Sequence, residues 1–337
     1  MRMDVICATD DGFAQHCGVM LCSLFENNKE HEVVAHVIES GLSGDNKSRL
    51  EQVAQRAGQT LQFHRLAEGA AKDCLLHESS AVTEAAYYRL FVASLIDDET
   101  IERVVYLDCD MIVRKDLSPL FRLDMSTATI AAVRDINSPM HWEQAEFIGF
   151  AYDDVYFNSG VLVINLRRWR AAGVEAVLLK ESTRRRRIFF PDQDVLNKVF
   201  RRQWTELPPR WNRFHLVNYS KIHFRRPQDE NEYIYDPAIV HFASNAARPW
   251  MHLGGVPFAD EYDRYAALTP WAGYAKREMP DRRRRERMIR SVKQSNAVYR
   301  SPYAVRAVCV GLMDIALFIY HIVKHRGSLR HYRHYHL

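Results

Sequence analysis

Two aspartates, Asp108 and Asp110, lie one residue apart in "ERVVYLDCDMIVRKDL", directly after the apolar, β-branched segment "VVYL". That segment has the composition of a central strand, and carboxylates at its end need a partner. Side chains two apart on an extended segment point to the same side, so both carboxylates could face one cation. Hard carboxylate oxygens suit Mg²⁺ or Mn²⁺, particularly when a diphosphate completes the coordination shell. The structural alternative is that one aspartate caps the next turn while the other pairs with Arg114 or Lys115.

The elements that must position these acids alternate between predicted strands and predicted helices. The strands are expected at residues 3–10, 32–40, 60–66, 103–113, 128–135 and 160–166, and the helices at 14–28, 44–58, 84–96, 172–183 and 192–201. This alternation predicts an α/β fold with a largely parallel sheet. Ligands of such sheets bind beyond the carboxyl ends of the strands. Asp10, Asp108 and Asp135 each end a predicted strand, so they could converge on one crevice.

The composition is that of a soluble globular protein. The 337 residues, 47% hydrophobic and 26% charged, can form one large domain or two small ones. The N-terminal segment reaches Asp10 and Asp11 too early to contain the apolar core of a signal peptide. Six cysteines form no C-x-x-C pair and no metal-ligand spacing, which favours reduced thiols in a cytoplasm over a disulfide framework.

Charge is distributed unevenly along the chain. Residues 276–337 hold 15 Lys and Arg against 4 Asp and Glu, whereas residues 1–275 hold 31 against 38. A basic tail behind a mildly acidic body indicates that the tail meets an anionic surface, either a membrane or a nucleic acid.

Five ordered motifs together resemble glycosyltransferase family 8, from about Met3 to about Trp250. They are "CATDDGFAQHCGVMLCSL", "YYRLFVASLI", "DDVYFNSGVLVINLRRWR", "FPDQDVLN" and "IVHFASNAARPW". That family includes bacterial lipopolysaccharide and lipooligosaccharide galactosyl- and glucosyltransferases, and glycogenin. The resemblance implies a single GT-A domain, expected over residues 1–275, with a Rossmann-like, mainly parallel sheet. It also implies transfer of a hexose from a UDP-sugar with retention of configuration, using Mn²⁺.

The resemblance assigns a metal site to three residues. Asp108 and Asp110 match the metal-ligating acids of the family's D-x-D motif, and His241 in "IVHF" matches a histidine that supplies a third ligand. An imidazole suits Mn²⁺ better than Mg²⁺, which stays as the alternative ion. Taken alone, a histidine after an apolar run is more often a satisfied core residue.

The resemblance also assigns residues to the donor nucleotide. Ala8 and Asp10 match residues that hold the uridine, and Phe13 can stack on uracil. Arg89 matches an arginine near the donor sugar and the metal-bound acids; a salt bridge to one of those acids is its structural alternative. Arg248 could clamp the diphosphate bidentately. Cys109, inside the D-x-D motif, is counted with this set, although its side chain should point the other way as a small buried residue.

Four further residues match positions around the donor hexose. On local pattern alone, Asn158 is a turn residue and Asp192 caps a helix after Pro191. The full set that the resemblance places at the hexose, and from which a catalytic group would come, is Asp135, Asn158, Asp192 and Gln193.

The chain departs from the family pattern in two places. Ser244 and Asn245 stand where a glycine is expected, and Arg248 replaces a lysine and follows His241 by seven residues, not six. At the end of the first strand, Gly12 and Phe13 replace the common Asn and Tyr. The ring of Phe13 can still stack on uracil, but the tyrosine hydroxyl is lost. These departures leave the identity of the hexose open between galactose and glucose.

Three functions remain to be compared. In the first, a retaining transferase, the acceptor hydroxyl attacks from the face that UDP leaves, and the leaving phosphate takes its proton. A covalent glycosyl-enzyme on Gln193 or Asp192 is less favoured, because an amide is a poor nucleophile. The second is a nucleotidyltransferase that makes a nucleotide-sugar, but "ATDDGFAQH" is acidic where a Gly-rich basic loop is expected. The third is an inactive sugar- or membrane-binding protein.

The tail contains a nearly continuous apolar run from Ala307 to Val323, interrupted by Asp314 and His321. A run of about 17 residues is at the short limit for a membrane span, and the aspartate would be costly there. The alternatives are a helix packed on the catalytic domain and a helix lying at the cytoplasmic membrane surface. We favour the surface helix, with basic residues on both flanks. The expected partners are UDP-galactose or UDP-glucose, a saccharide or lipid-linked glycan acceptor and the membrane surface, with no nucleic acid.

Overall fold

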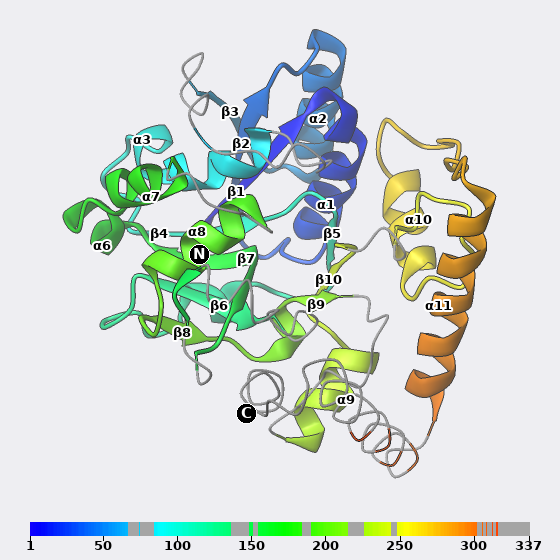
Figure 1. The fold of residues 1–337 in the computed structure, drawn as a ribbon. Coiled ribbons are helices and arrows are strands. Elements are labelled where there is room, and N and C mark those ends of the chain that lie inside the picture. The colour runs from blue at the N-terminus through cyan, green and yellow to red at the C-terminus, as the bar shows by residue number, and fades with distance from the viewer. Residues whose placement is uncertain are drawn as a thin grey trace.

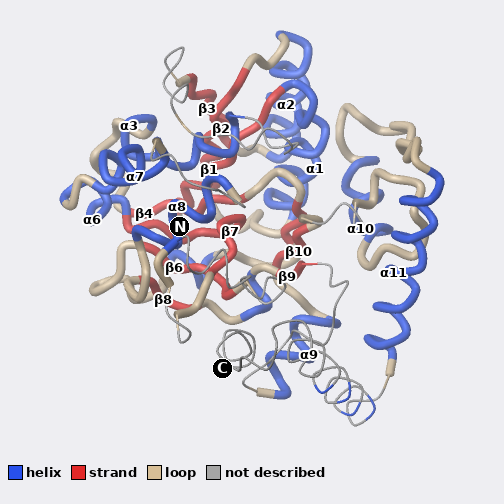
Figure 2. Tube along the Cα trace, in the orientation of Figure 1, coloured by secondary structure: helices blue, strands red, loops and turns tan. Residues whose placement is uncertain are grey.

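The structure is a computed structural model that describes residues 1–66, 74, 84–135, 148–150, 154–183, 190–214, 226–243, 248–301, 305, 308, 312 and 315. A central main sheet carries helices on both faces, and a small second sheet lies beside it (Figure 1, Figure 2). The predicted α/β class is confirmed.

The main sheet is mostly parallel, as the alternation of strands and helices predicts. Its described strands lie in the order β3 (Thr60–Arg65), β2 (Glu32–Ser40), β1 (Arg2–Asp10), β4 (Arg103–Leu107), β7 (Phe157–Asn165), β6 (Ile130–Arg134) and β8 (Trp204–Glu206). All neighbouring pairs are parallel except those of β7, which runs antiparallel to both β4 and β6.

The antiparallel strand β7 begins at the edge where its parallel neighbours end. Asn158 and Ser159 are therefore the second and third residues of a strand. The turn that the local pattern predicted at Asn158 is not formed. The pairing of β6 with β7 jumps from Ala132 opposite Leu162 to Val133 opposite Asn158. Such a bulge commonly re-aims side chains next to an active site.

The single strand predicted over residues 103–113 is in fact two strands in two sheets. β4 ends at Leu107, and the chain turns a corner through Asp108 and Asp110 before β5 (Met111–Val113) joins the small sheet. The small sheet has the order β5, β10 (Ile239–His241) and β9 (Arg213–Phe214). Local composition could not reveal this break, because both halves are equally apolar.

Helices cover one face of the main sheet and pack on the small sheet. Met3, Val5 and Cys7 of β1 point to this side, where they join one hydrophobic core. Its helices are α1 (Ala14–Glu26), α2 (Gly44–Ala57), the short α4 (Ser118–Phe121) and α10 (Ala259–Ala267).

The opposite face buries a second core, to which Ile6 of β1 points. The helix predicted over residues 84–96 is a 3₁₀ helix, η2 (Glu84–Phe91), followed by the short α3 (Val92–Leu95). In a three-residue turn, positions three apart lie in line, and Tyr87 and Leu90 are both fully buried here. The other helices on this face are α6 (Leu166–Ala171), α7 (Val174–Ser182) and α8 (Pro191–Val199).

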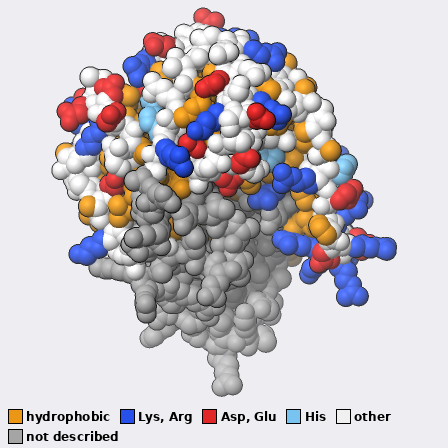
Figure 3. Space-filling view, turned by 90° about the horizontal axis from the view of Figure 1, so that it is seen from above, with side chains coloured by type: hydrophobic (Ala, Val, Ile, Leu, Met, Phe, Trp, Pro, Cys, Tyr) orange, Lys and Arg blue, Asp and Glu red, His pale blue; other side chains and the backbone are white. Residues whose placement is uncertain are grey.

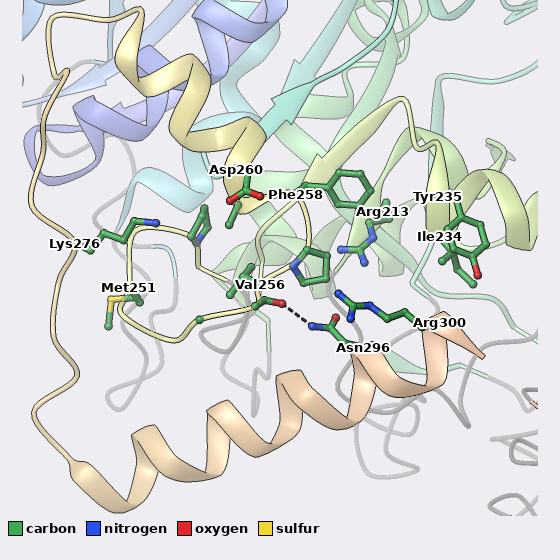
Figure 4. A pocket seen from close by; sticks show the side chains of 15 residues that line it. Arg213, Ile234, Tyr235, Met251, Val256, Phe258, Asp260, Lys276, Asn296 and Arg300 are labelled. Carbon is green, nitrogen blue, oxygen red and sulfur yellow. Dashed lines mark hydrogen bonds between the residues drawn. The ribbon is translucent and has the colours of Figure 1, made fainter.

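The C-terminal elements stand at one flank of the molecule (Figure 1). Between β9 and β10 lies α9 (Pro227–Tyr235), and after α10 comes the long α11 (Arg282–Arg300). Val292 of α11 is fully buried, and Nδ2 of Asn296 donates to the backbone oxygen of Gly255 at 2.6 Å. A cavity of about 670 Å³ lies under α11, lined in part by Arg213, Phe258 and Arg300 (Figure 4).

No helix in the described part of the chain is long and apolar enough to cross a membrane. Of the apolar run from Ala307 to Val323, the structure describes only Val308, Leu312 and Ile315. The interpretation of the remaining tail lies outside the described residues.

The close contact between α1 and the segment after α10 generates a stability prediction. A Cβ on Gly18 would lie 2.4 Å from Cζ3 of Trp271. Gly18→Ala gains about 1 kcal/mol of helix propensity but costs about 1–3 kcal/mol by overpacking. We expect a net fall in the thermal unfolding midpoint. In a Trp271→Ala background the same substitution should raise the midpoint; an unchanged sign in this double-mutant cycle would contradict the contact.

Candidate active site

Two carboxylates and one imidazole meet where the chain crosses from the main sheet to the small sheet. Nε2 of His241 lies 3.2 Å from Oδ1 of Asp110 and 3.8 Å from Oδ2 of Asp108. One ligand atom from each residue lies within 4.8 Å of the other two. The register brings them together, because His241 on β10 pairs with Met111, directly after Asp110. The structure thus gathers the three residues for which a metal-binding role is predicted.

Arg89 is a buried guanidinium on the acidic side of this cluster. Nη2 donates to Oδ1 of Asp108 at 2.8 Å, and Nε lies 3.1 Å from Oδ2 of Asp192. The guanidinium carbon lies 4.6 Å from the centroid of the Tyr106 ring. Burial lowers the pKa of Arg89, but the charges of Asp108 and Asp192 outweigh burial and raise it. The salt bridge offered as the structural alternative for Arg89 is present.

One part of the structural alternative for the D-x-D acids, an ion pair with Arg114 or Lys115, is not found in the described part of the chain. Arg114 pairs with Glu261 at 2.9 Å, and Lys115 pairs with Asp236 at 2.9 Å. The basic residues that follow Asp110 therefore form ion pairs with other acids, and Asp108 and Asp110 face the crevice.

The predicted hexose residues form one hydrogen-bond network. Oδ2 of Asp135 accepts from Nδ2 of Asn158 at 3.4 Å and from Nε2 of Gln193 at 3.2 Å. Oε1 of Gln193 accepts from the backbone N–H of Ser159 at 2.9 Å, and Asp192 accepts from the hydroxyl of Ser159 at 3.0 Å. Burial raises the pKa of Asp192 although the Arg89 charge opposes it. Asp192 lies in the first turn of α8, not at its N-cap position.

The bulge in β7 lets the two parts of the site approach each other. A Cβ on Gly160 would lie 2.5 Å from Cε1 of His241 and 2.8 Å from Oδ2 of Asp108. The backbone oxygen of Gly160 also accepts from the N–H of Asp108 at 2.9 Å. Only glycine fits here, a requirement that the motif "FNSG" did not reveal.

Further residues that the sequence analysis assigned to the uridine lie at or beside the end of β1. Oδ1 of Asp10 accepts from the backbone N–H of Phe13 at 3.0 Å and caps the short helix η1 (Asp11–Phe13). Sγ of Cys109 donates to the backbone oxygen of Ala8 at 3.1 Å. The side chain of Cys109 points into the core, as predicted, and ties the D-x-D segment to β1.

The thiols beneath that segment form a cluster that sequence spacing did not predict. The sulfur atoms of Cys7, Cys17 and Cys109 lie within 4.8 Å of one another, and all three residues are buried. The five cysteines in the described residues are free thiols.

An aromatic cluster and a partly buried guanidinium flank the crevice on the side of the small sheet. Trp250 stacks on His16 with ring centroids 3.8 Å apart, and Phe13 lies edge-on to both rings. The guanidinium carbon of Arg248 lies 5.8 Å from the centroid of the Trp250 ring. Nε of Arg248 is buried and has no hydrogen-bond partner in the described chain. Burial lowers the pKa of Arg248 against the charge of Asp110, and Arg277 lowers it further.

The imidazole of His241 and the carboxylate of Asp110 shift each other's pKa. Burial lowers the pKa of His241, but the carboxylates of Asp110 and Asp108 outweigh burial and raise it. Burial alone would raise the pKa of Asp110, but His241 outweighs it and the pKa is lowered. The site is therefore anionic enough to attract and hold positive charge.

The donor set fits a divalent cation. Two carboxylates and one imidazole converge, and Nδ1 of His241 is already bonded to Oδ1 of Asn212 at 3.0 Å, so Nε2 is the nitrogen that faces the acids. Oxygen ligands with one imidazole suit Mn²⁺. Asn212, Ser159, Gly160 and Tyr106 are site residues that sequence reasoning did not assign.

The chain is similar to known proteins over most of its length. The sequence model of glycosyl transferase family 8 matches residues 4–254. General stress protein A of Bacillus subtilis is 35% identical over 279 residues, covering 80% of this chain and 94% of that protein. A lipopolysaccharide 1,3-galactosyltransferase of Salmonella typhimurium is 25% identical over 282 residues, covering 80% of each.

The solved structure of galactosyltransferase LgtC, in complex with donor and acceptor sugar analogs, is also similar. It has a TM-score of 0.69 and 25% identity, and the match covers 80% of this chain and 96% of that one. The predicted GT-A fold is confirmed. From the five sequence motifs, this fold and the family match over residues 4–254, we conclude that the chain belongs to glycosyl transferase family 8.

Proposed function

We propose that this chain is a retaining hexosyltransferase that takes a UDP-sugar donor and a divalent cation, Mn²⁺, and extends a saccharide acceptor. The convergence of Asp108, Asp110 and His241 within 4.8 Å is the observation that carries this proposal. A cation held there supplies charge stabilisation to a leaving diphosphate.

Arg248 supports the diphosphate assignment. Its Nε is buried and has no hydrogen-bond partner within the described residues. A buried donor without an acceptor is costly, and a phosphate oxygen would satisfy it. We therefore assign to Arg248 the neutralisation of charge on the leaving group.

The hydrogen bonds and ion pair of Gln193 and Asp192 support front-face transfer, in which the acceptor hydroxyl attacks from the face that UDP leaves. Both ends of the Gln193 amide are engaged, by Ser159 and by Asp135, and Asp192 is paired with Arg89. Neither is a free nucleophile. In the proposed step the bond from C1 of the hexose to the UDP oxygen breaks while the acceptor oxygen bonds to C1. The acceptor's proton passes to the leaving phosphate oxygen.

We assign the donor subsites accordingly. Ala8, Asp10, Phe13 and Cys109 lie at the uridine, and Asp135 and Asn158 bind hexose hydroxyls. Galactose and glucose are the hexoses proposed, since relatives include a lipopolysaccharide 1,3-galactosyltransferase and a lipopolysaccharide 1,2-glucosyltransferase.

For the acceptor we propose a lipopolysaccharide core or other lipid-linked glycan, reached at the cytoplasmic membrane surface. Val305, Val308, Leu312 and Ile315 follow a helical spacing and are 47%, 62%, 62% and 57% exposed. Lys and Arg side chains gather on the flank where α11 lies (Figure 3). An apolar stripe beside basic side chains suits anionic lipid. We place the boundary between the catalytic domain and this tail near residue 275.

The donor and the metal are tested together by UDP release. We expect the purified chain to release UDP slowly from UDP-galactose or UDP-glucose when Mn²⁺ is present and to stop when a chelator removes it. GDP- and CMP-sugars serve as controls. Stabilisation of the fold by a GDP- or CMP-sugar, with none by UDP, would refute the donor assignment.

Asp110→Ala should lower turnover about 100-fold or more, since it removes charge that acts on the leaving group, and leave the fold intact. Asp110 is a cleaner test than Asp108, because Asp108→Ala would also leave Arg89 with one partner fewer. Asp45→Ala, at an exposed position on α2, is the matched control and should keep wild-type turnover. Near-normal turnover of Asp110→Ala in Mn²⁺ would exclude Asp110 as a ligand.

The tail proposal is tested by sedimentation with anionic liposomes at low salt. We expect the full chain to sediment and the triple variant Val308→Glu, Leu312→Glu, Ile315→Glu to stay in solution. Leu268→Glu, which is 40% exposed on the catalytic domain, is the control and should sediment normally. A truncation should follow Ser301, because α11 buries Val292. Failure of the full chain to sediment would contradict the proposal.

A further inference from the structure

Asn212 lies between the histidine of the metal cluster and the hexose network. Its side chain is fully buried between the short helix η3 (Pro209–Trp211) and the first residue of β9, Arg213. Oδ1 of Asn212 lies 3.0 Å from Nδ1 of His241, and Nδ2 donates to Oδ1 of Asn158 at 2.9 Å. Both ends of this one amide are therefore committed, one to each half of the site.

The orientation of the Asn158 amide is determined by two neighbours, one that can only donate a hydrogen bond and one that accepts when ionised. The backbone N–H of Gly160, which can only donate, bonds to Oδ1 of Asn158 at 2.9 Å. The carboxylate Oδ2 of Asp135, an acceptor when ionised, lies 3.4 Å from Nδ2 of Asn158. A flipped amide would set donor against donor at Gly160 and acceptor against acceptor at Asp135.

The orientation of Asn158 then fixes that of Asn212. Because Oδ1 of Asn158 accepts, Asn212 must present Nδ2 to it and turn its Oδ1 toward His241. An amide oxygen can only accept, so Nδ1 of His241 carries a hydrogen. The lone pair that a metal needs is then on Nε2, the nitrogen 3.2 Å from Asp110.

We propose that Asn212 is a positioning residue that, through this relay from Gly160 and Asn158, fixes the ring orientation and tautomer of His241 for metal binding. The inference rests on the metal site of the proposed function. Partners that hold the second nitrogen of a ligating histidine commonly matter about 10- to 100-fold for metal affinity. Through the relay, Asn158, which we assign to the hexose, also orients a metal ligand. This role does not depend on a bound sugar.

The test is the affinity of the full chain for Mn²⁺ alone, measured from the free Mn²⁺ signal in electron paramagnetic resonance. Asn212→Leu should weaken binding about 10- to 100-fold. Asn212→Asp keeps an acceptor toward Nδ1 of His241 and should restore near wild-type affinity. Asn158→Ala, which leaves His241 and its partner in place but frees the Asn212 amide to flip, should weaken binding about 2- to 10-fold, the worth of one hydrogen bond.

Asn165→Leu is the matched control for loss of a buried asparagine. Asn165 lies at the opposite end of β7 and bonds to Arg168 and Met125. Asn165→Leu should lower the midpoint of thermal unfolding without changing the affinity for Mn²⁺. The relay is overturned if Asn212→Leu binds as the wild type does, if Asn212→Asp binds as weakly as Asn212→Leu, or if Asn165→Leu weakens binding equally. A wild-type chain that binds no Mn²⁺ would overturn the metal proposal and the relay together.

Discussion

The site depends on one electrostatic constraint: carboxylates can be gathered at a buried sheet edge only if positive charge lies among them. Arg89 meets part of this need, because its buried guanidinium bonds to Asp108 and lies 3.1 Å from Asp192. Asp110 takes His241 as its partner. An unpaired charge in such a place would cost several kcal/mol, on the order of the stability of a whole domain. The charges of Asp108, Asp110, Asp192 and Arg89 sum to −2. A divalent cation beside a neutral His241 would balance them.

The topology serves the same constraint. The corner between β4 and β5 moves Asp110 out of the main sheet and sets it beside His241, because β5 and β10 pair in register. The antiparallel course of β7 brings its first residues, rather than its last, to the carboxyl edge of the parallel strands. The bulge then turns Gly160 toward His241 at a distance that no larger residue permits. A parallel strand in the place of β7 would have delivered Asn165 to this edge and not Asn158.

The sequence predicted the parts of the site that short motifs encode and missed those that depend on contacts between distant segments. The D-x-D pair and the alternation of strands and helices follow from local pattern, whereas the role of His241 follows from the resemblance to the family. The β4–β5 corner does not, since its two halves are equally apolar and only pairing with β10 separates them. Asn212 carries no local signal either; its importance comes from Asn158 and His241, which lie 54 and 29 residues away. The 3₁₀ course of η2 likewise has no local signal; it brings Tyr87 and Leu90, three residues apart, into the buried core.

The C-terminal segment explains how the chain tolerates its departure from the family pattern at Arg248. Trp250 is buried, stacked on His16, and its backbone oxygen accepts from the N–H of Arg277 at 2.8 Å. The backbone oxygen of Arg277 in turn accepts from the N–H of His252 at 3.1 Å. The segment after residue 248 is thus fixed by contacts of its own, so the position of Arg248 is set by Trp250 and not by the count of residues from His241. The additional residue precedes Arg248 in the sequence, outside the segment that these contacts hold.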